Sequence, residues 1–253
     1  MKHSIKALGW AINVLWVLMI LFAATTIYSG VNFLQGPELR CVKSYVEGEA
    51  IIRQFSISVN NTGFYNIHDL NITTYAEDPA GEVISKPSTS LVPFIIKGST
   101  SNVTHNLILN FSDIVSRRLH HLIFNDTVLN QFWSVSAKIA GVMPISIRMN
   151  NTIDWKAPLS NFSVSNPSFE ADTATVSITL ENHSPLTVTT SITLELYSEE
   201  GVLLGSTLLS VYAPPGYYHR EITLFVDSSE VTYSGFVRVY FLDFDFEECF
   251  PYG

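Results

Sequence analysis

The hydrophobic pattern of this chain divides it into one apolar segment and a long region of alternating residues. Residues 7–37 contain no acidic or basic side chain, and they follow a head that carries Lys2 and Lys6. A helix of about 20 apolar residues is long enough to cross the hydrocarbon core of a bilayer. The pattern therefore predicts a membrane-spanning signal-anchor helix over residues 7–34, preceded by a cytoplasmic head of residues 1–6.

Charge sets the expected orientation of this helix. Positive residues precede it and Glu38 follows it, which places the N-terminus in the cytoplasm and residues 38–253 outside the cell. Two alternatives stay open. A cleaved signal sequence would be cut near Ala23 and Ala24, whereas a pilin-type leader would be cut near Leu8 and would leave the apolar helix as a filament core.

Beyond the helix, apolar and polar residues alternate with the period of two that is typical of a half-buried strand. The alternation runs through residues 55–60 and returns through residues 176–181. Asn61 and Asn182 follow these two strands at the same relative position. The match indicates an internal repeat, and hence two related domains.

Turn residues complete the pattern in each copy. Gly81 and Gly201 follow the next strand at matching positions, so we expect two hairpins per copy, which is typical of a β-sandwich. The first copy adds a helix that Ser112 caps, and the second copy lacks both this helix and the pair of strands after it. The expected fold is mainly β, with the transmembrane helix followed by two β-sandwich domains over residues 38–155 and 156–253.

Several stretches of the first copy carry a family resemblance. They are SVNNTGFYNIHDLNITTYAEDPAG, IIKGST and WSVSAKIAGVMPISIRMNNTIDWKAPLSNFSV. These runs resemble the late-embryogenesis-abundant type 2 (LEA-2) group, which includes the water-stress and hypersensitive-response (WHy) domain, and more specifically the archaeal membrane-anchored proteins with tandem copies of that domain. The resemblance covers residues 43–158 and, more weakly, residues 160–246. It implies a seven-stranded, fibronectin-III-like sandwich without catalytic residues, and a role in stress protection, membrane association or scaffolding.

Eight Asn-x-Ser/Thr sequences, the acceptor for N-linked glycans, support an exported surface. The acceptors are Asn60, Asn71, Asn102, Asn110, Asn125, Asn150, Asn161 and Asn182. The alternative is that Asn, Ser and Thr are common in turns and on the solvent faces of strands. No Asn follows Asn182, so we expect the last 71 residues to be free of N-linked sugar and available for protein contact.

Four further residues are candidates for covalent or surface contacts. Cys41 and Cys249 are the two cysteines of the chain. An oxidising exterior permits a disulfide between them, but an extended arrangement of the domains would keep them apart. Pairing within the chain, pairing between chains and free thiols therefore all stay open. Tyr217 and Tyr218 follow a Pro-Pro-Gly turn and are candidates for an exposed contact.

The titratable residues form no recognisable catalytic motif. His120 and His121 are neighbours in the predicted helix and point about 100° apart, so we interpret them as part of a solvated face rather than a zinc site. Asp243, Asp245 and Glu247 alternate along a predicted strand without a Gly turn, and we interpret them as the charged face of an edge strand rather than a calcium site. We therefore expect no catalytic, metal-binding or cofactor-binding residues.

Charge and composition narrow the function further. The net charge is −9 with 15% charged residues and no Lys/Arg cluster, which argues against a nucleic-acid partner. We expect a single-pass, glycosylated membrane protein that acts as a non-enzymatic binding or scaffolding module at the cell surface. Its expected partners are the lipid bilayer and either another protein or a second copy of itself. The alternatives are a pilin-like filament subunit with a processed helix, and a LEA-2-type role in stress protection or in lipid or glycan binding.

Overall fold

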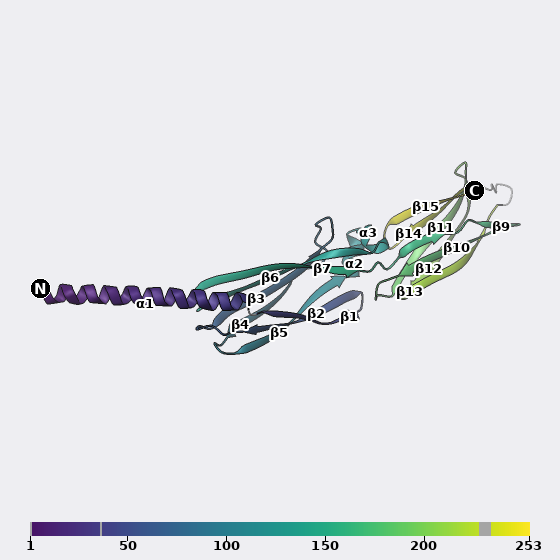
Figure 1. Ribbon diagram of the computed structural model, residues 1–253. Helices are drawn as coiled ribbons and strands as arrows, with labels where there is room; N and C mark the ends of the chain where they lie inside the picture. Colours follow the sequence, from purple (N-terminus) through teal and green to yellow (C-terminus); the bar gives the residue numbers. More distant parts are fainter. Residues whose placement is uncertain (1, 36, 228–233) are drawn as a thin grey trace.

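The computed structural model describes residues 2–35, 37–227 and 234–253, and it shows one long helix followed by two β-sandwiches arranged end to end (Figure 1). Helix α1 spans Lys2–Gln35. Within it, Leu8–Gln35 is long and apolar enough to cross a membrane, by length and composition. The fold is mainly β, as the alternating pattern predicts, and the two termini lie at opposite ends of the molecule.

Two antiparallel sheets form the first sandwich. One sheet has the order β1 (Glu38–Glu47), β2 (Ala50–Asn60) and β5 (Thr100–Asn110). The facing sheet has the order β4 (Ser88–Ile95), β3 (Ile67–Glu77), β6 (Thr127–Ile139) and β7 (Met143–Trp155). Alternate residues of β3 and β6 are buried between the sheets, because successive side chains of a strand point to opposite faces.

The second sandwich repeats this plan. One sheet has the order β13 (Gly216–Phe225), β10 (Thr173–Asn182) and β8 (Ser160–Val164), with the short β9 (Ser168–Glu170) beside β10. The facing sheet has the order β12 (Leu203–Ala213), β11 (Val188–Ser198), β14 (Gly235–Phe241) and β15 (Phe246–Tyr252). Strands β10 to β15 take the places of β2 to β7, so the internal repeat that the sequence indicates is a repeat of topology.

The second copy is more complete than its sequence suggests. The prediction that it lacks the last pair of strands is wrong, because β14 and β15 form an antiparallel hairpin. The hairpin is not evident from the sequence, because its turn at residues 242–245 contains neither Gly nor Pro and its two Asp residues alternate with Leu242 and Phe244 as they would in a strand. The chain is reversed instead with Asp245 in a left-handed backbone conformation, at a φ of 47°.

The helix predicted in the first copy is two short helices. α2 (Phe111–Ser116) and α3 (His120–Phe124) are separated by Arg118, whose φ of 56° interrupts the helical backbone. The N-cap is Asn110 rather than Ser112, because the Asn110 side chain accepts a hydrogen bond from the Ser112 backbone N–H at 3.1 Å. The described part of the second copy contains no helix, as predicted.

A buried asparagine holds the first point in each sandwich where the chain crosses from one sheet to the other. The sequence pattern predicts hairpins after Asn61 and Asn182, but the strands on either side belong to facing sheets, so each connection is an arch between sheets. Asn61 is 3% exposed and Asn182 is 2% exposed. Each amide nitrogen donates to two backbone carbonyl groups at 2.7–3.1 Å, namely Tyr65 and Ile95 for Asn61, and Leu186 and Ala213 for Asn182. These bonds satisfy carbonyl groups that would otherwise be buried without a donor.

The last turns of α1 pack against the first sandwich. Thr25 Oγ1 and Tyr65 Oη are 2.8 Å apart, and the Phe64 backbone N–H donates to Ser29 Oγ at 2.9 Å. Gly63 permits this approach, because a Cβ at that position would lie 2.8 Å from the Ser29 Cβ. The helix is therefore joined to the first domain by side-chain contacts as well as by the chain.

Replacement of Asn182 by Ala should destabilise the second sandwich. The change leaves two buried carbonyl groups without a donor, and each such group costs about 1–3 kcal/mol. Thermal unfolding of the unglycosylated chain, followed by circular dichroism, should show a lower midpoint. Asn150→Ala, at an exposed position of β7, is the matched control and should leave the midpoint unchanged. Equal midpoints for the two variants would contradict the role of the Asn182 amide.

Candidate functional site

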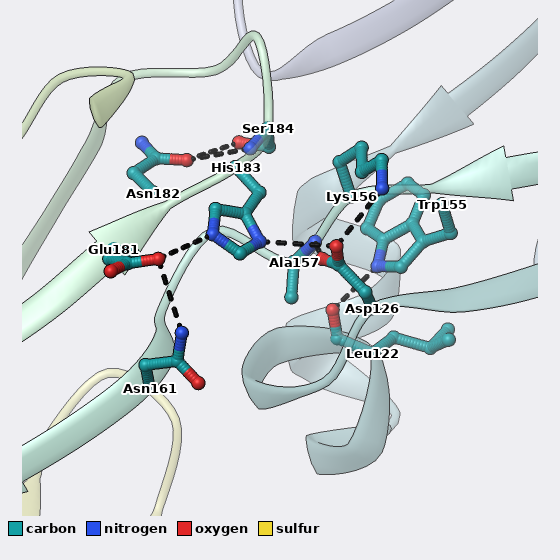
Figure 2. A network of polar contacts seen from close by, with 10 residues as sticks. All are labelled: Leu122, Asp126, Trp155, Lys156, Ala157, Asn161, Glu181, Asn182, His183 and Ser184. Atoms are coloured by element: carbon teal, nitrogen blue, oxygen red, sulfur yellow. Dashed lines mark hydrogen bonds and ion pairs between the residues drawn. The ribbon is translucent and has the colours of Figure 1, made fainter. Parts of the chain in front are cut away.

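A network of polar contacts joins the two sandwiches, and Figure 2 shows it from close by. Residues 156–159 connect β7 to β8, and Ala157 and Leu159 within this linker are fully buried. Backbone hydrogen bonds hold the linker on both sides: the His183 N–H donates to the Ala157 carbonyl and the Leu159 N–H donates to the Ile123 carbonyl, each at 3.0 Å. A linker this short and this well bound restricts independent movement of the domains.

Asp126, in the loop after α3, is the centre of the network. Its Oδ1 accepts a hydrogen bond from the Ala157 backbone N–H at 2.8 Å. Its Oδ2 lies 3.1 Å from Lys156 Nζ and 3.1 Å from His183 Nδ1. The other ring nitrogen of His183, Nε2, lies 2.8 Å from Glu181 Oε2. A protonated His183 therefore donates to one carboxylate of each domain and bridges the junction (Figure 2).

The ionisation of these groups follows from their contacts. The hydrogen bonds to Glu181 and Asp126 raise the pKa of His183 above its ordinary value. The hydrogen bond from His183, with one from Asn161, lowers the pKa of Glu181. Burial raises the pKa of Asp126, but the hydrogen bonds from Ala157, Lys156 and His183 outweigh it and the net shift is downward. Each carboxylate and the imidazolium thus favour the charged form of the other.

Aromatic packing forms the apolar side of the junction. The Phe124 ring at the end of α3 lies with its centroid 5.4 Å from that of Phe241 and 4.7 Å from that of Phe246. Phe111 at the start of α2 packs edge-on against Phe244 at 6.1 Å. Because α2 and α3 have no counterpart in the described part of the second copy, the additional helices of the first domain serve to build the junction.

A cleft of about 590 Å³ opens beside the junction. Residues of both domains line it: His120, His121, Phe124, Asn125, Asp126, Ser160, Asn161, Phe162, Phe246 and Glu248. Amide, imidazole and carboxylate groups beside aromatic rings provide hydrogen-bonding partners for a polar ligand. Burial raises the pKa of Glu248. Within residues 2–35, 37–227 and 234–253, the structure contains no group of three or more His, Cys, Asp or Glu side chains that could hold a metal ion.

The eight predicted glycan acceptors differ in exposure. Asn60, Asn102, Asn125, Asn150 and Asn161 are exposed, and Asn71 and Asn110 are half-buried. Asn182 is buried, and its amide nitrogen already donates to two carbonyl groups. A glycan on that nitrogen would replace one of its two N–H donors and would have to fit inside the protein, so the structure argues against the prediction of an acceptor at Asn182. The Asn-His-Ser sequence there forms the arch instead, with Ser184 Oγ donating to Asn182 Oδ1 at 2.7 Å.

The two cysteines are on different domains and do not pair with each other. Cys41 lies on β1 of the first sandwich and Cys249 lies on β15 of the second, and both thiols are free and exposed. The extended arrangement in Figure 1 keeps these strands apart, so a disulfide within the chain is excluded by its geometry. Pairing between chains and free thiols stay as predictions.

The acidic residues near the C-terminus do not share a strand face, so that interpretation is wrong. Asp243 and Asp245 lie in the turn between β14 and β15, and Glu247 lies on β15. Asp243 Oδ2 accepts from Thr190 Oγ1 and from the Ser191 backbone N–H, each at 2.9 Å. Asp245, in turn, forms an ion pair with Arg118 of the first domain, so it contributes to the junction.

The two adjacent histidines also have separate partners. His120 Nε2 lies 3.1 Å from the Phe244 carbonyl oxygen in the second domain, so the prediction of a solvated helix face is wrong for His120. His121 Nε2 lies 2.9 Å from Asp78 Oδ2 within the first domain. The two rings thus bind different parts of the molecule rather than one common ion.

The predicted contact residues Tyr217 and Tyr218 lie on β13. Tyr217 is 70% exposed and Tyr218 is half-buried against the core, because successive residues of a strand face opposite sides. Tyr217 is therefore the one of the pair that is available for contact.

Sequence reasoning missed the residues that build the junction. Asp126 and His183 are 57 residues apart, and each has an ordinary sequence context. The local signal is that Glu181 and His183 occupy alternate positions at the end of a strand, which places them on one face. That signal identifies a possible pair but gives no indication of Asp126.

Comparisons with known proteins add no family. No family model and no curated protein matches the chain. Among solved structures, red sea bream transglutaminase is 15% identical, with a TM-score of 0.34, and the match covers 85% of this chain and 30% of that chain. The periplasmic chaperone SfaE is 14% identical, with a TM-score of 0.30, and the match covers 85% of this chain and 98% of that chain.

Glycan occupancy should follow the exposure of the acceptor. After expression in a host with N-linked glycosylation, we expect glycopeptide mass spectrometry to find glycan at exposed positions such as Asn102 and Asn150 and none at Asn182. Asn150 is a suitable internal control, since it is exposed on β7. A folded chain that carries glycan at Asn182 would refute the buried arch.

The stability of the junction should depend on pH through His183. Because folding raises its pKa, the contribution of His183 is fully present below its ordinary pKa of about 6.5 and is lost as the pH rises through the raised value. Asp126 and Glu181 have lowered pKa values, so their contribution is lost in acid. We expect the thermal midpoint to fall above pH 6.5. His183→Gln should remove that fall and His219→Gln, at an exposed position of β13, should keep it; identical profiles would refute the bridge.

Proposed function

We propose that this protein is a membrane-anchored stalk that holds its second sandwich away from the bilayer and presents it to another protein. In this proposal α1 stays in the membrane with its N-terminus in the cytoplasm, and both sandwiches lie outside the cell. The protein acts by display and scaffolding and is not an enzyme.

The observation that carries this proposal is the continuity of the molecule from α1 to the C-terminal domain. Among the described residues, a hydrophobic cluster runs from Phe33 of α1 through both sandwiches. By contrast, the apolar window of α1 is only 6% buried. An exposed apolar surface of this length needs lipid or another protein to cover it. A helix that is fixed both to the bilayer and to the sandwiches would set the distance of the second domain from the membrane.

Two features support the second sandwich as the contact end. It lies farthest from α1 (Figure 1), and residues 183–253 contain no Asn that could carry a glycan. Its surface also exposes aromatic side chains, with Tyr212 and Tyr217 exposing 63% and 70% of their areas. Tyrosine provides a large contact area together with a polar tip, and it is enriched at protein interfaces.

The junction groups support a structural role for the titratable residues found there. A general base needs a nitrogen or oxygen with a free lone pair near the reacting proton. In its protonated form, His183 carries a hydrogen on each ring nitrogen and has no such lone pair, and it donates the two hydrogens to Asp126 and Glu181. The Trp155 indole N–H is also used in the junction, where it donates to the Leu122 carbonyl at 2.6 Å. These groups bind one another and hold the domains together.

A filament subunit is the second candidate, and the exposed apolar helix is the observation that favours it. In such an assembly α1 would pack against copies of itself and the sandwiches would cover the outside. Membership of the LEA-2 group, with its stress-protective, lipid-binding or glycan-binding roles, stays a proposal that rests on the sequence resemblance.

Cross-linking in native membranes would separate these functions. We expect mass spectrometry of the cross-linked material to find a defined partner joined to the second sandwich. A ladder of links between copies of the chain, with a mature N-terminus near Leu8, would support the filament instead. A mature chain that starts after Ala24 and is recovered in the soluble fraction would lack most of α1 and would refute both the stalk and the filament.

Charges in the centre of α1 should release the protein from the membrane. A Lys at the centre of a membrane-spanning helix costs about 2.5–3.5 kcal/mol. The double change Leu15→Lys and Leu18→Lys should therefore reduce the fraction of protein that resists carbonate extraction. The matched control is Leu208→Lys with Tyr212→Lys on exposed positions of β12, and it should leave that fraction unchanged. Equal retention of the two variants would refute the anchor.

A further inference from the structure

Three loops of the first sandwich meet at the end from which α1 emerges. We call these loops, residues 61–66, 96–99 and 140–142, the base of the domain. The Asn66 carbonyl accepts from the Ala140 N–H at 3.1 Å, and Asn66 Oδ1 accepts from the Lys97 N–H at 2.9 Å. The base is therefore one connected surface, and the contacts of α1 with residues 63–65 attach the helix to it.

Exposed apolar side chains gather at the same end of the domain as the base. Strand register places Ile67 opposite Ile95 and Ile139, so the segments just beyond these residues lie at the same end of the sheet. Four large apolar side chains at this end are exposed: Phe64 by 57%, Phe94 by 45%, Ile96 by 58% and Val142 by 66%. Exposure alone does not identify a binding surface, because Phe225 on the second sandwich is 84% exposed.

The position of the base along α1 distinguishes it from the other exposed apolar surfaces. A helix rises about 1.5 Å per residue, so a hydrocarbon core of about 30 Å takes up about 20 residues. Counted from Leu8, the first residue of the apolar stretch, the hydrocarbon ends near Ile27. The next residue, Tyr28, packs on Phe64 of the base with ring centroids 5.5 Å apart. The base thus lies at the height where the hydrocarbon gives way to headgroups.

The polar groups of the base and of the adjoining turn of α1 also fit a position at the membrane interface. Tyr28 and Tyr65 are aromatic residues of the kind that are enriched at membrane interfaces. Lys97 is the single charged residue in the three loops, and its positive charge would lie beside lipid phosphates. Nearby, Lys138 is paired with Asp69 at 2.9 Å, so it adds no net charge.

We propose that the base of the first sandwich is seated in the lipid–water interface, with Phe64, Phe94, Ile96 and Val142 inserted among the headgroups around α1. The partner of this surface is the bilayer itself, because the helix that crosses it is continuous with the base. The first sandwich therefore stands on the membrane rather than on a flexible tether. This inference rests on the proposed function, since it requires α1 to span a membrane.

Nitroxide labels on the full chain in liposomes of phosphatidylcholine and phosphatidylglycerol would test whether the base lies in the lipid–water interface. Both native cysteines are replaced by Ser, and single labels are placed at Val142→Cys and Ile96→Cys. Leu15→Cys in α1 is the reference for lipid and Leu208→Cys on β12 is the reference for water. Oxygen concentrates in lipid and a nickel chelate stays in water, so their relative collision rates with each label report its depth.

We expect the Val142 and Ile96 labels to show an oxygen-to-nickel ratio at least several-fold above that of the Leu208 label, and below that of the Leu15 label. If the base labels match Leu208 while Leu15 lies in lipid, α1 is a membrane anchor and the interfacial position of the base is refuted. If all four labels report water, both the membrane anchor and the interfacial position of the base are refuted.

Discussion

Both sandwiches depend on how the chain satisfies its backbone where it leaves one sheet for the other. Beside these arches, β4 and β12 end with Ile95 and Ala213, which are buried inside the protein. Asn61 and Asn182 donate to the carbonyl groups of these two residues and to that of a residue in the same arch. Because a buried polar group without a partner is costly, this one side chain allows two sheets to face each other around a continuous core.

Much of the fold could be predicted because apolar and polar residues alternate in the sequence with the same period of two as buried and exposed residues in a strand. The alternation predicts individual strands, and the repeated Asn and Gly positions predict two copies. Periodicity does not report which sheet a strand joins, so arches are mistaken for hairpins. A turn in which polar and apolar residues alternate, as in residues 242–245, also has the pattern of a continuous strand. Arg118 and Asp245 both adopt left-handed backbone conformations. Arg gives no indication of this conformation, and Asp permits it without requiring it, so one predicted helix is two and one predicted strand is a hairpin.

The junction was beyond sequence reasoning for a different reason. Its central contact joins Asp126 and His183, which come together only after two domains have formed and packed. The same three letters, Asn-His-Ser, describe a glycan acceptor and a buried turn, and only the surroundings of Asn182 distinguish them. The additional helices of the first copy were predicted only in part. Their apolar residues are evident in the sequence, but the sequence does not show that these residues pack on the aromatic side chains of the second domain.

The path of the chain through the first sandwich has a mechanical consequence. The strand that follows α1 starts with Glu38 at the end where α1 is attached, and the chain leaves at the opposite end with Trp155. Tension applied between α1 and the second domain would therefore be directed along the strands. Hydrogen bonds in an antiparallel pair lie across the strands, so such a force shears many bonds at once instead of opening them one by one. The first sandwich is thus arranged to resist a pull between α1 and the second domain.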